Sequence, residues 1–100
     1  MYIIVVGGGS VGYHLCKALL REGHEVLVLD KDATKCENFE DELGSVCVRG
    51  DGCEVATLAE AGTSRAEVFI AATDEDEDNL VACQVAKHKF GVPRTIARVN

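Results

Sequence analysis

Apolar and polar positions alternate along this 100-residue chain in blocks that match strands and helices in turn. Short apolar runs, typical of parallel strands buried on both faces, occupy residues 3–6, 25–30, 46–49, 68–71 and 95–99. Apolar residues at helical spacing predict helices at about residues 11–22, 34–43, 55–61 and 75–90. Because strands alternate with helices through short turns, the pattern predicts an α/β fold, a Rossmann-type doubly wound parallel sheet in a single domain over residues 1–100.

The first apolar run leads directly into a Gly-x-Gly-x-x-Gly turn. Gly7 permits a tight turn, Gly9 has no side chain to block the approach of a pyrophosphate, and Gly12 lets the next helix lie close to the strand. Ser10 and Val11 open that helix, whose first amide groups lack partners within the helix and lie at its positive dipole end. The turn is therefore predicted to bind phosphate oxygens through backbone amides.

An acidic residue, Asp30, closes the second apolar run. It lies close to the offset of roughly 20 residues from the glycines at which a carboxylate accepts hydrogen bonds from ribose hydroxyls. The glycine pattern alone is common. Strand, glycines, helix and acid in this order together indicate a dinucleotide site.

Composition and charge argue against several classes of function. The formal net charge of −7, with no cluster of Lys or Arg, argues against nucleic acid or an anionic membrane as a partner. The chain is short for an enzyme that transfers hydride, because such enzymes usually carry a separate substrate-binding region. No apolar run approaches a membrane span or resembles a signal peptide. These features favour a cytoplasmic cofactor-binding module.

The cysteines are five in number, scattered, and form no Cys-x-x-Cys pair. Reduced thiols are the simplest interpretation of Cys16, Cys36, Cys47, Cys53 and Cys83. Cys16 and Cys83 fall within helical patterns and are expected to pack as small apolar residues. Cys53 opens a segment beside the predicted pocket, so it is the candidate for a reactive thiol.

Five adjacent carboxylates, residues 74–78, precede the last predicted helix. They could attract a divalent cation, but adjacent helical residues splay around the axis and cannot all converge on one ion. Negative charge at a helix start complements the helix dipole, with Thr73 or Asp74 available to cap free amides. Helix initiation is therefore preferred to a metal site.

Besides the glycine turn, four further segments occur in a characteristic order, residues 49–52, 58–62, 70–79 and 96–99. With these segments the chain resembles the N-terminal nucleotide-binding domain of Trk potassium-uptake regulatory proteins, also called the TrkA-N, RCK or KTN domain. The resemblance covers essentially the whole chain. It implies a regulatory domain that is not an enzyme and that binds NAD or NADH, with ATP or ADP as alternatives.

The resemblance also implies roles for particular residues. Gly7, Gly9, Ser10 and Gly12 match the phosphate turn. Asp30 matches the ribose-binding acid, where a carboxylate repels a ribose 2′-phosphate and so favours NAD over NADP.

Further site residues follow the second, third and fourth strands. Asp51 resembles the position that borders the adenine, while Thr73 and Asp74 would face the far half of the pocket. The simpler alternatives are that residues 50–52 form only a tight turn and that Thr73 is only a cap. Lys31 would reach a phosphate or lie solvated on the surface, and Arg98 would face a dimer partner or the pocket.

In similar proteins this domain forms dimers or higher oligomers and moves a membrane-embedded potassium transporter or channel between conducting states. The resemblance thus implies a cytoplasmic location, peripheral to the inner face of the cell membrane. Family members usually continue beyond residue 100, so we expect an excised domain or a short stand-alone subunit, truncated after the fifth strand. An unpaired sheet edge at the third or fifth strand would then be open to dimerisation.

The alternative from another class is the cofactor-binding domain of an NAD-dependent oxidoreductase, since the same fold serves both roles. Few residues favour it. His14 lies near the glycine turn but is expected on a helix surface, and no His-Asp or Tyr-Lys pair for proton transfer is evident. A redox-sensing role for Cys53 is a third hypothesis.

Overall fold

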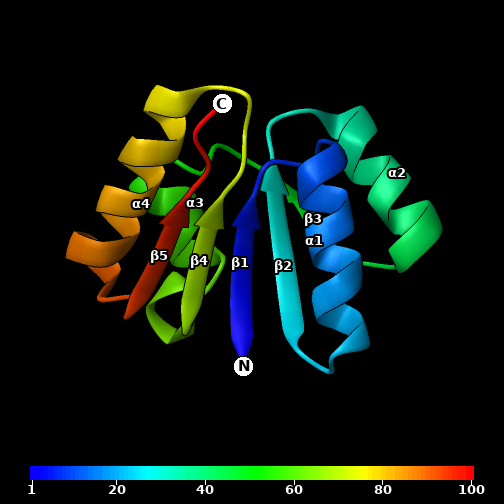
Figure 1. Cartoon of the computed structure of the whole chain (residues 1–100), viewed down its shortest axis with the longest axis horizontal. Helices are drawn as coiled ribbons and strands as arrows, with labels where there is room; N and C mark the ends of the chain where they lie inside the picture. The colour runs from blue at the N-terminus through cyan, green and yellow to red at the C-terminus, as the bar shows by residue number, and fades with distance from the viewer.

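The computed structural model describes residues 1–100 as a five-stranded parallel sheet with helices on both faces (Figure 1). The strands are β1 (Tyr2–Val6), β2 (Glu25–Asp30), β3 (Cys47–Arg49), β4 (Val68–Ala71) and β5 (Arg94–Ala97). The helices are α1 (Ser10–Arg21), α2 (Ala33–Leu43), α3 (Val55–Glu60) and α4 (Asp76–Phe90), with a 3-10 turn η1 (Thr63–Arg65). The predicted Rossmann-type doubly wound sheet is confirmed.

The strand order is β3-β2-β1-β4-β5, and every neighbouring pair is parallel. The chain therefore builds outward from β1 to β3, then returns to the other side of β1 for β4 and β5. In sheets of this kind, ligands bind outside the carboxyl ends of the strands where the order reverses. That point lies at the ends of β1 and β4, at the upper edge of the sheet in Figure 1.

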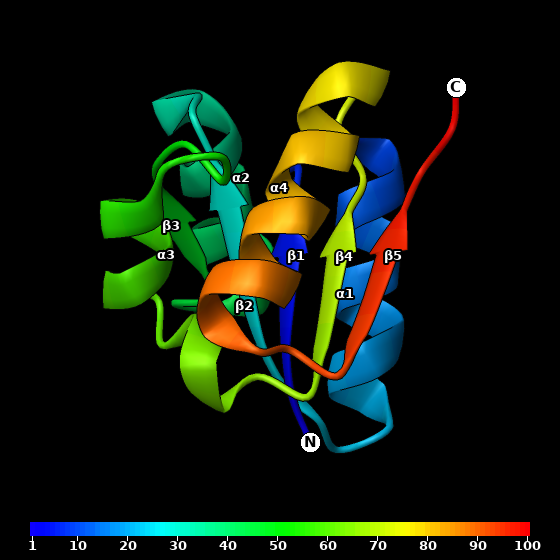
Figure 2. The same ribbon diagram turned by 90° about the vertical axis from the view of Figure 1, so that its left-hand side faces the viewer.

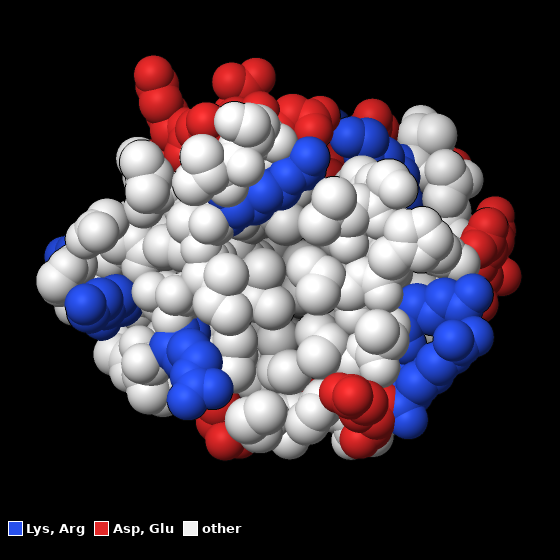
Figure 3. Space-filling view, in the orientation of Figure 1, with Lys and Arg blue, Asp and Glu red and all other residues white.

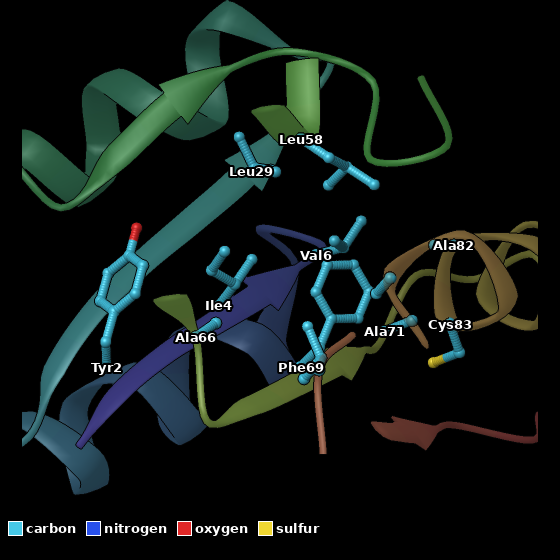
Figure 4. Close-up of a cluster of buried hydrophobic side chains, with 12 residues drawn as sticks. Tyr2, Ile4, Val6, Leu29, Leu58, Ala66, Phe69, Ala71, Ala82 and Cys83 are labelled. Atoms are coloured by element: carbon cyan, nitrogen blue, oxygen red, sulfur yellow. The ribbon is translucent and has the colours of Figure 1, made fainter. Parts of the chain in front are cut away.

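Two apolar layers flank the sheet because successive strand side chains point to opposite faces. Ile3 and Val5 of β1 pack in the layer under α1 and α2. Ile4 and Val6 pack in the other layer, with Phe69 of β4 and residues of α3 and α4 (Figure 4). Figure 2 shows α4 on the face of the sheet opposite to α1. Burial on both faces explains why the strands read as continuous apolar runs.

The structure departs from the sequence prediction mainly at the ends of elements. The third strand begins at Cys47, although the Val46 carbonyl already accepts from the Val28 amide at 2.7 Å. The fifth strand ends at Ala97 instead of Val99. Its extension was predicted from apolar residues, but the chain beyond it turns to α4, where the Asn100 amide donates to Asp76 at 2.8 Å. The turn η1 was not predicted.

The edges of the sheet are β3 and β5, as predicted. None of the helices combines the length and the apolar character needed to cross a lipid bilayer.

Candidate functional site

The glycine turn is held by contacts that leave no room for side chains. Gly7 has a φ of +115°, and a Cβ there would lie 2.8 Å from the Ala72 carbonyl oxygen. A Cβ on Gly12 would lie only 1.7 Å from the Gly7 carbonyl oxygen. Both positions therefore require glycine for reasons internal to the fold. At Gly9, by contrast, a Cβ would meet nothing within 4 Å, so this glycine faces open space.

The start of α1 is free of protein capping groups. Its N-cap residue is Gly9, no side chain caps the first amides, and the first turn contains no acidic residue. Ser10 and Val11 line a hollow of about 180 Å³ together with Gly7 and Gly9. Unpartnered amides at the positive end of a helix dipole, open to a hollow, favour an anion.

Asp30 is fixed against this turn. One carboxylate oxygen accepts from the Gly8 amide at 2.6 Å and the other accepts from the Asp32 amide at 2.8 Å. Both contacts leave lone pairs free, because an ionised carboxylate offers about four acceptor sites. The half-buried carboxylate is thus oriented by backbone groups before any ligand arrives.

A cleft of about 290 Å³ opens at the carboxyl ends of β1, β2 and β4. It shares Gly7, Asp30, Lys35, Thr73 and Asp74 with the hollow beside the start of α1, so the two adjoin across the glycine turn. Its remaining lining residues are Val6, Leu29, Lys31, Asp32, Gly50, Asp51, Gly52, Cys53, Glu75 and Asp78. All ten residues predicted for the site line one of these two spaces, except Gly12, which supports the turn from behind.

Asp51 both lines the cleft and shapes its own turn. Its carboxylate accepts from the Cys53 amide at 2.9 Å, and its carbonyl accepts from the Glu54 amide at 3.1 Å. The tight-turn interpretation of residues 50–52 therefore holds alongside the lining role. Burial, followed by the Asp51 and Asp78 carboxylates, raises the pKa of the Cys53 thiol. This environment disfavours the thiolate and gives no support to Cys53 as a reactive group.

Thr73 is positioned by a buried residue, Asn79, that was not predicted for the site. The Asn79 side-chain oxygen accepts from the Thr73 amide at 2.9 Å, and its amide group donates to the carbonyls of Thr73 and Arg98 at 3.0 and 3.1 Å. Asn79 is fully buried and joins the ends of β4 and β5. A polar residue one turn into a packed helix could have signalled this role, but one of its partners, Arg98, is 19 positions away in sequence.

The capping prediction for α4 is corrected by these contacts. The N-cap residue is Glu75 and no side chain caps the helix amides. Thr73 accepts from the Glu75 amide at 3.2 Å, just before the helix, whereas Asp74 turns away to Arg98. Acidic residues do occupy the first turn of α4, as predicted.

Arg98, which sequence reasoning left between a dimer partner and the pocket, lines the hollow beside α1. Its guanidinium lies 3.6 Å from the Asp74 carboxylate and donates to the Ala72 carbonyl at 3.4 Å. Lys31 lies exposed at the cleft rim, 4.0 Å from the Asp78 carboxylate. Lys35, which lines both spaces, was missed because a lone lysine on an exposed helix carries no distinguishing pattern.

The five carboxylates of residues 74–78 do not converge on one point where an ion could bind. Asp74 pairs with Arg98, Asp76 accepts from Asn100, and Asp78 approaches Lys31. No group of three or more His, Cys, Asp or Glu residues has a geometry that could hold a metal ion. Acidic atoms gather along the upper edge of the molecule, with basic side chains among them (Figure 3). An anionic ligand here would therefore depend on backbone amides and on a few nearby cations.

The sequence model of the TrkA-N domain family matches residues 3–100 of this chain. This chain belongs to the TrkA-N family. It is 40% identical over 100 residues to the Trk system potassium uptake protein TrkA homolog of Methanothermobacter thermautotrophicus, covering all of this chain and 46% of that protein. It is 38% identical over 99 residues to the Trk system potassium uptake protein TrkA of Streptomyces coelicolor, covering 99% and 44%. The chain thus spans less than half the length of these TrkA relatives.

Solved structures that superpose on this chain include both an RCK domain and an enzyme. The GsuK RCK domain superposes with a TM-score of 0.84 at 26% identity, covering 99% of this chain and 21% of that one. The Thermus thermophilus UDP-glucose 4-epimerase, in complex with NAD, superposes with a TM-score of 0.74 at 27% identity, covering 95% and 36%. The fold alone therefore does not separate regulation from catalysis.

Proposed function

We propose that this TrkA-N chain binds NAD or NADH in the cleft at the carboxyl ends of β1, β2 and β4, with ATP or ADP as alternatives. Binding shifts the population between two arrangements of the domain and so regulates potassium transport by a membrane-embedded transporter or channel. Turnover of the nucleotide is not part of this function.

The observation that carries the proposal is the pairing of an uncapped helix start with a pre-oriented carboxylate. Ser10 and Val11, at the uncapped start of α1, line a hollow. Asp30 lies across the glycine turn, and its carboxylate has lone pairs that are free to accept further hydrogen bonds. A pyrophosphate on the amides would place an adjacent ribose at Asp30, where its hydroxyls donate to the carboxylate. The same carboxylate would disfavour a 2′-phosphate, and hence NADP.

The rest of the ligand is assigned to the two spaces that meet at the turn. The larger cleft, with Lys31 and Asp51 at its rim, suits the adenosine half. The hollow lined by Asp74 and Arg98, with Thr73 between the two spaces, suits the second half of a dinucleotide or terminal phosphates. Because Gly9 has no side chain, it leaves room for the ligand to pass between the cleft and the hollow.

Potassium transport is proposed because both of these relatives are Trk system potassium uptake proteins. We infer a cytoplasmic position at the inner face of the membrane, where the domain meets its transporter. A dimer or higher oligomer would cover the apolar side chains exposed near the β5 edge, such as Ile96 and Val99.

A hydride-transferring enzyme is the alternative, because the NAD-bound epimerase shares the fold. Proton transfer there needs an acid or base beside the cofactor. His14, His24 and His88 line neither the cleft nor the hollow, and the Asp30 carboxylate beside the glycine turn is already held by two backbone amides. The geometry therefore favours binding without chemistry.

Calorimetric titration of the purified protein with NAD, NADH, NADP, ATP and ADP tests this proposal. We expect one nucleotide without a 2′-phosphate to bind, and Asp30→Ala to weaken its affinity by about tenfold or more, since a lost charge-assisted hydrogen bond costs about 1.5–3 kcal/mol. Asp41→Ala, an exposed carboxylate on α2 away from the cleft, serves as the matched control.

The nucleotide incubated with the protein is afterwards recovered and analysed for chemical change. Binding without conversion supports the regulatory function, whereas oxidation or reduction of the nucleotide supports the enzyme. Failure of all five nucleotides to bind, with a folded protein by circular dichroism, would contradict the proposed site.

A further inference from the structure

Two buried cysteines from different elements contact each other in the apolar layer between the sheet and α2. Cys36 of α2 and Cys47 of β3 lie 11 residues apart in sequence, and their sulfur atoms are 2.6 Å apart. Only 8% and 9% of their surfaces are exposed. Two thiols in contact from different elements are placed so that a disulfide would link α2 to β3.

The fold itself brings these thiols together. Cys47 begins the edge strand β3, opposite Val28 of β2. Cys36 lies in the first turns of α2, the helix that crosses back over the same face of the sheet, and both side chains join the apolar layer with Phe39. The sequence offered no Cys-x-x-Cys spacing to signal the pair. The juxtaposition exists only in three dimensions.

We propose that Cys36 and Cys47 are a dithiol site that a hydroperoxide, such as hydrogen peroxide, oxidises reversibly to an intramolecular disulfide. The inference goes beyond the proposed nucleotide function and does not depend on it. It also differs from a redox role for Cys53, which has no second cysteine as a partner and hydrogen-bonds to the Asp78 carbonyl instead.

The reaction proceeds in two balanced steps. The Cys36 sulfur attacks one peroxide oxygen, the O–O bond breaks, and one water leaves while Cys36 becomes a sulfenic acid. The Cys47 sulfur then attacks the Cys36 sulfur, the S–O bond breaks, and the departing hydroxyl takes the Cys47 proton to form a second water. Two thiols are oxidised and one hydrogen peroxide is reduced to two waters.

Cys36 is assigned as the first thiol to react because its sulfur lies 3.9 Å from the carbonyl of Asp30, a residue that lines the cleft, whereas Cys47 lies on the edge strand β3. Cys47 is assigned as the resolving thiol. Burial, followed by its hydrogen bond with Cys36, raises the pKa of Cys47 well above its ordinary value. This disfavours the Cys47 thiolate as the first nucleophile.

A disulfide between Cys36 and Cys47 would constrain the two segments that contact Asp30. The Asp30 carbonyl accepts from the Gly50 amide at 2.8 Å, directly after β3, and lies 3.9 Å from the Cys36 sulfur on the α2 side. Arg49 of β3 also donates to the Lys31 carbonyl at 3.2 Å. A bond between α2 and β3 would therefore stiffen both flanks of the residue proposed to hold the ribose.

The test is a peptide map of the purified protein after treatment with hydrogen peroxide, without nucleotide. We expect an intact mass lower by two hydrogen atoms, one linked peptide pair joining Cys36 to Cys47, and recovery of the original mass with dithiothreitol. Closing this loop should raise the thermal midpoint of the oxidised protein by about 10 °C. Cys36→Ala and Cys47→Ala should each abolish the link, whereas Cys83→Ala should retain it.

Addition of oxygen atoms at Cys53, without a link between Cys36 and Cys47, would overturn the proposal. So would a link that joins other cysteines or two separate chains. Because the map is made on the unaltered protein, the result stands even if a cysteine variant fails to fold. Because no nucleotide is present, it is also independent of whether NAD or ATP binds.

Discussion

The two sides of the cleft are built in different ways. On the fixed side, which comprises the glycine turn and Asp30, backbone amides hold both carboxylate oxygens and the turn tolerates no added atom at Gly7 or Gly12. On the adjustable side, which comprises residues 73–75 and Arg98, the Asp74 side chain is 90% exposed and meets Arg98 at 3.6 Å. An ion pair of this kind contributes little to stability and is easily exchanged.

Under the proposed nucleotide-binding function, the difference implies a division of labour between the two sides. The fixed side can bind the pyrophosphate and ribose, which all the candidate ligands share, without a free-energy cost for reorganising its own groups. The adjustable side can exchange the Asp74–Arg98 pair for a contact with the part of the ligand that varies. Its base is nonetheless rigid, because buried Asn79 ties Thr73 to Arg98.

The largest effect is expected on the fixed side, from Gly12→Ala. The new Cβ would lie 1.7 Å from the Gly7 carbonyl oxygen, a backbone atom that cannot move without opening the turn. We expect the free energy of unfolding in urea to fall by about 3 kcal/mol or more, or the protein not to fold.

Gly9→Ala is the matched control, because a Cβ there meets nothing within 4 Å. Its unfolding free energy should stay within about 1 kcal/mol of the original, while nucleotide affinity falls because the added methyl group occupies the path of the pyrophosphate. Equal stability of the Gly12→Ala and Gly9→Ala proteins would show that the turn is not rigid.

A smaller loss is expected from Asn79→Ala, at the base of the adjustable side. The change leaves the Thr73 amide and the Thr73 and Arg98 carbonyls without their partner. Unfolding free energy should fall by about 2–3 kcal/mol. Leu80→Ala, on the exposed neighbouring position of α4, should change it by less than about 1 kcal/mol.

Amide hydrogen exchange then locates the effect of Asn79→Ala. We expect faster exchange at Thr73, with protection at Gly8 unchanged because that amide is held by Asp30 on the fixed side. Loss of protection on both sides alike would mean that the two sides are one cooperative unit and that the comparison fails.

The smallest effects are expected from the Asp74–Arg98 pair itself. Arg98→Gln and Asp74→Asn should leave the urea midpoint unchanged, because both groups keep access to water. Arg98→Gln should lower nucleotide affinity by about two- to fivefold, and Asp74→Asn should leave it unchanged or raise it, since a carboxylate repels phosphate. Calorimetry at low and high salt checks this, as the Arg98 effect should shrink when salt screens the charge.

Local sequence was sufficient for the parts of the molecule that are governed by local physics. Apolar runs marked the strands because both sheet faces are buried, and Gly7 and Gly12 marked the turn because only glycine fits at these two positions. Errors of one or two residues at β3 and β5 arose because strand ends depend on hydrogen bonds to neighbours, not on apolarity. The predicted cap by Thr73 or Asp74 was wrong, because the helix begins one residue later, with Glu75 as its N-cap, and Asp74 lies 3.6 Å from Arg98, 24 positions away.

The sequence by itself thus determined the parallel α/β architecture, the glycine turn and the position of the acid at residue 30, since each depends on residues that are neighbours along the chain or at one fixed spacing. Only the tertiary structure decided that Asn79 anchors the β4 side, that Arg98 lies in the hollow, and that Cys36 meets Cys47. These depend on how strands are ordered and how helices cross them, and such long-range packing leaves no periodic trace in a single sequence.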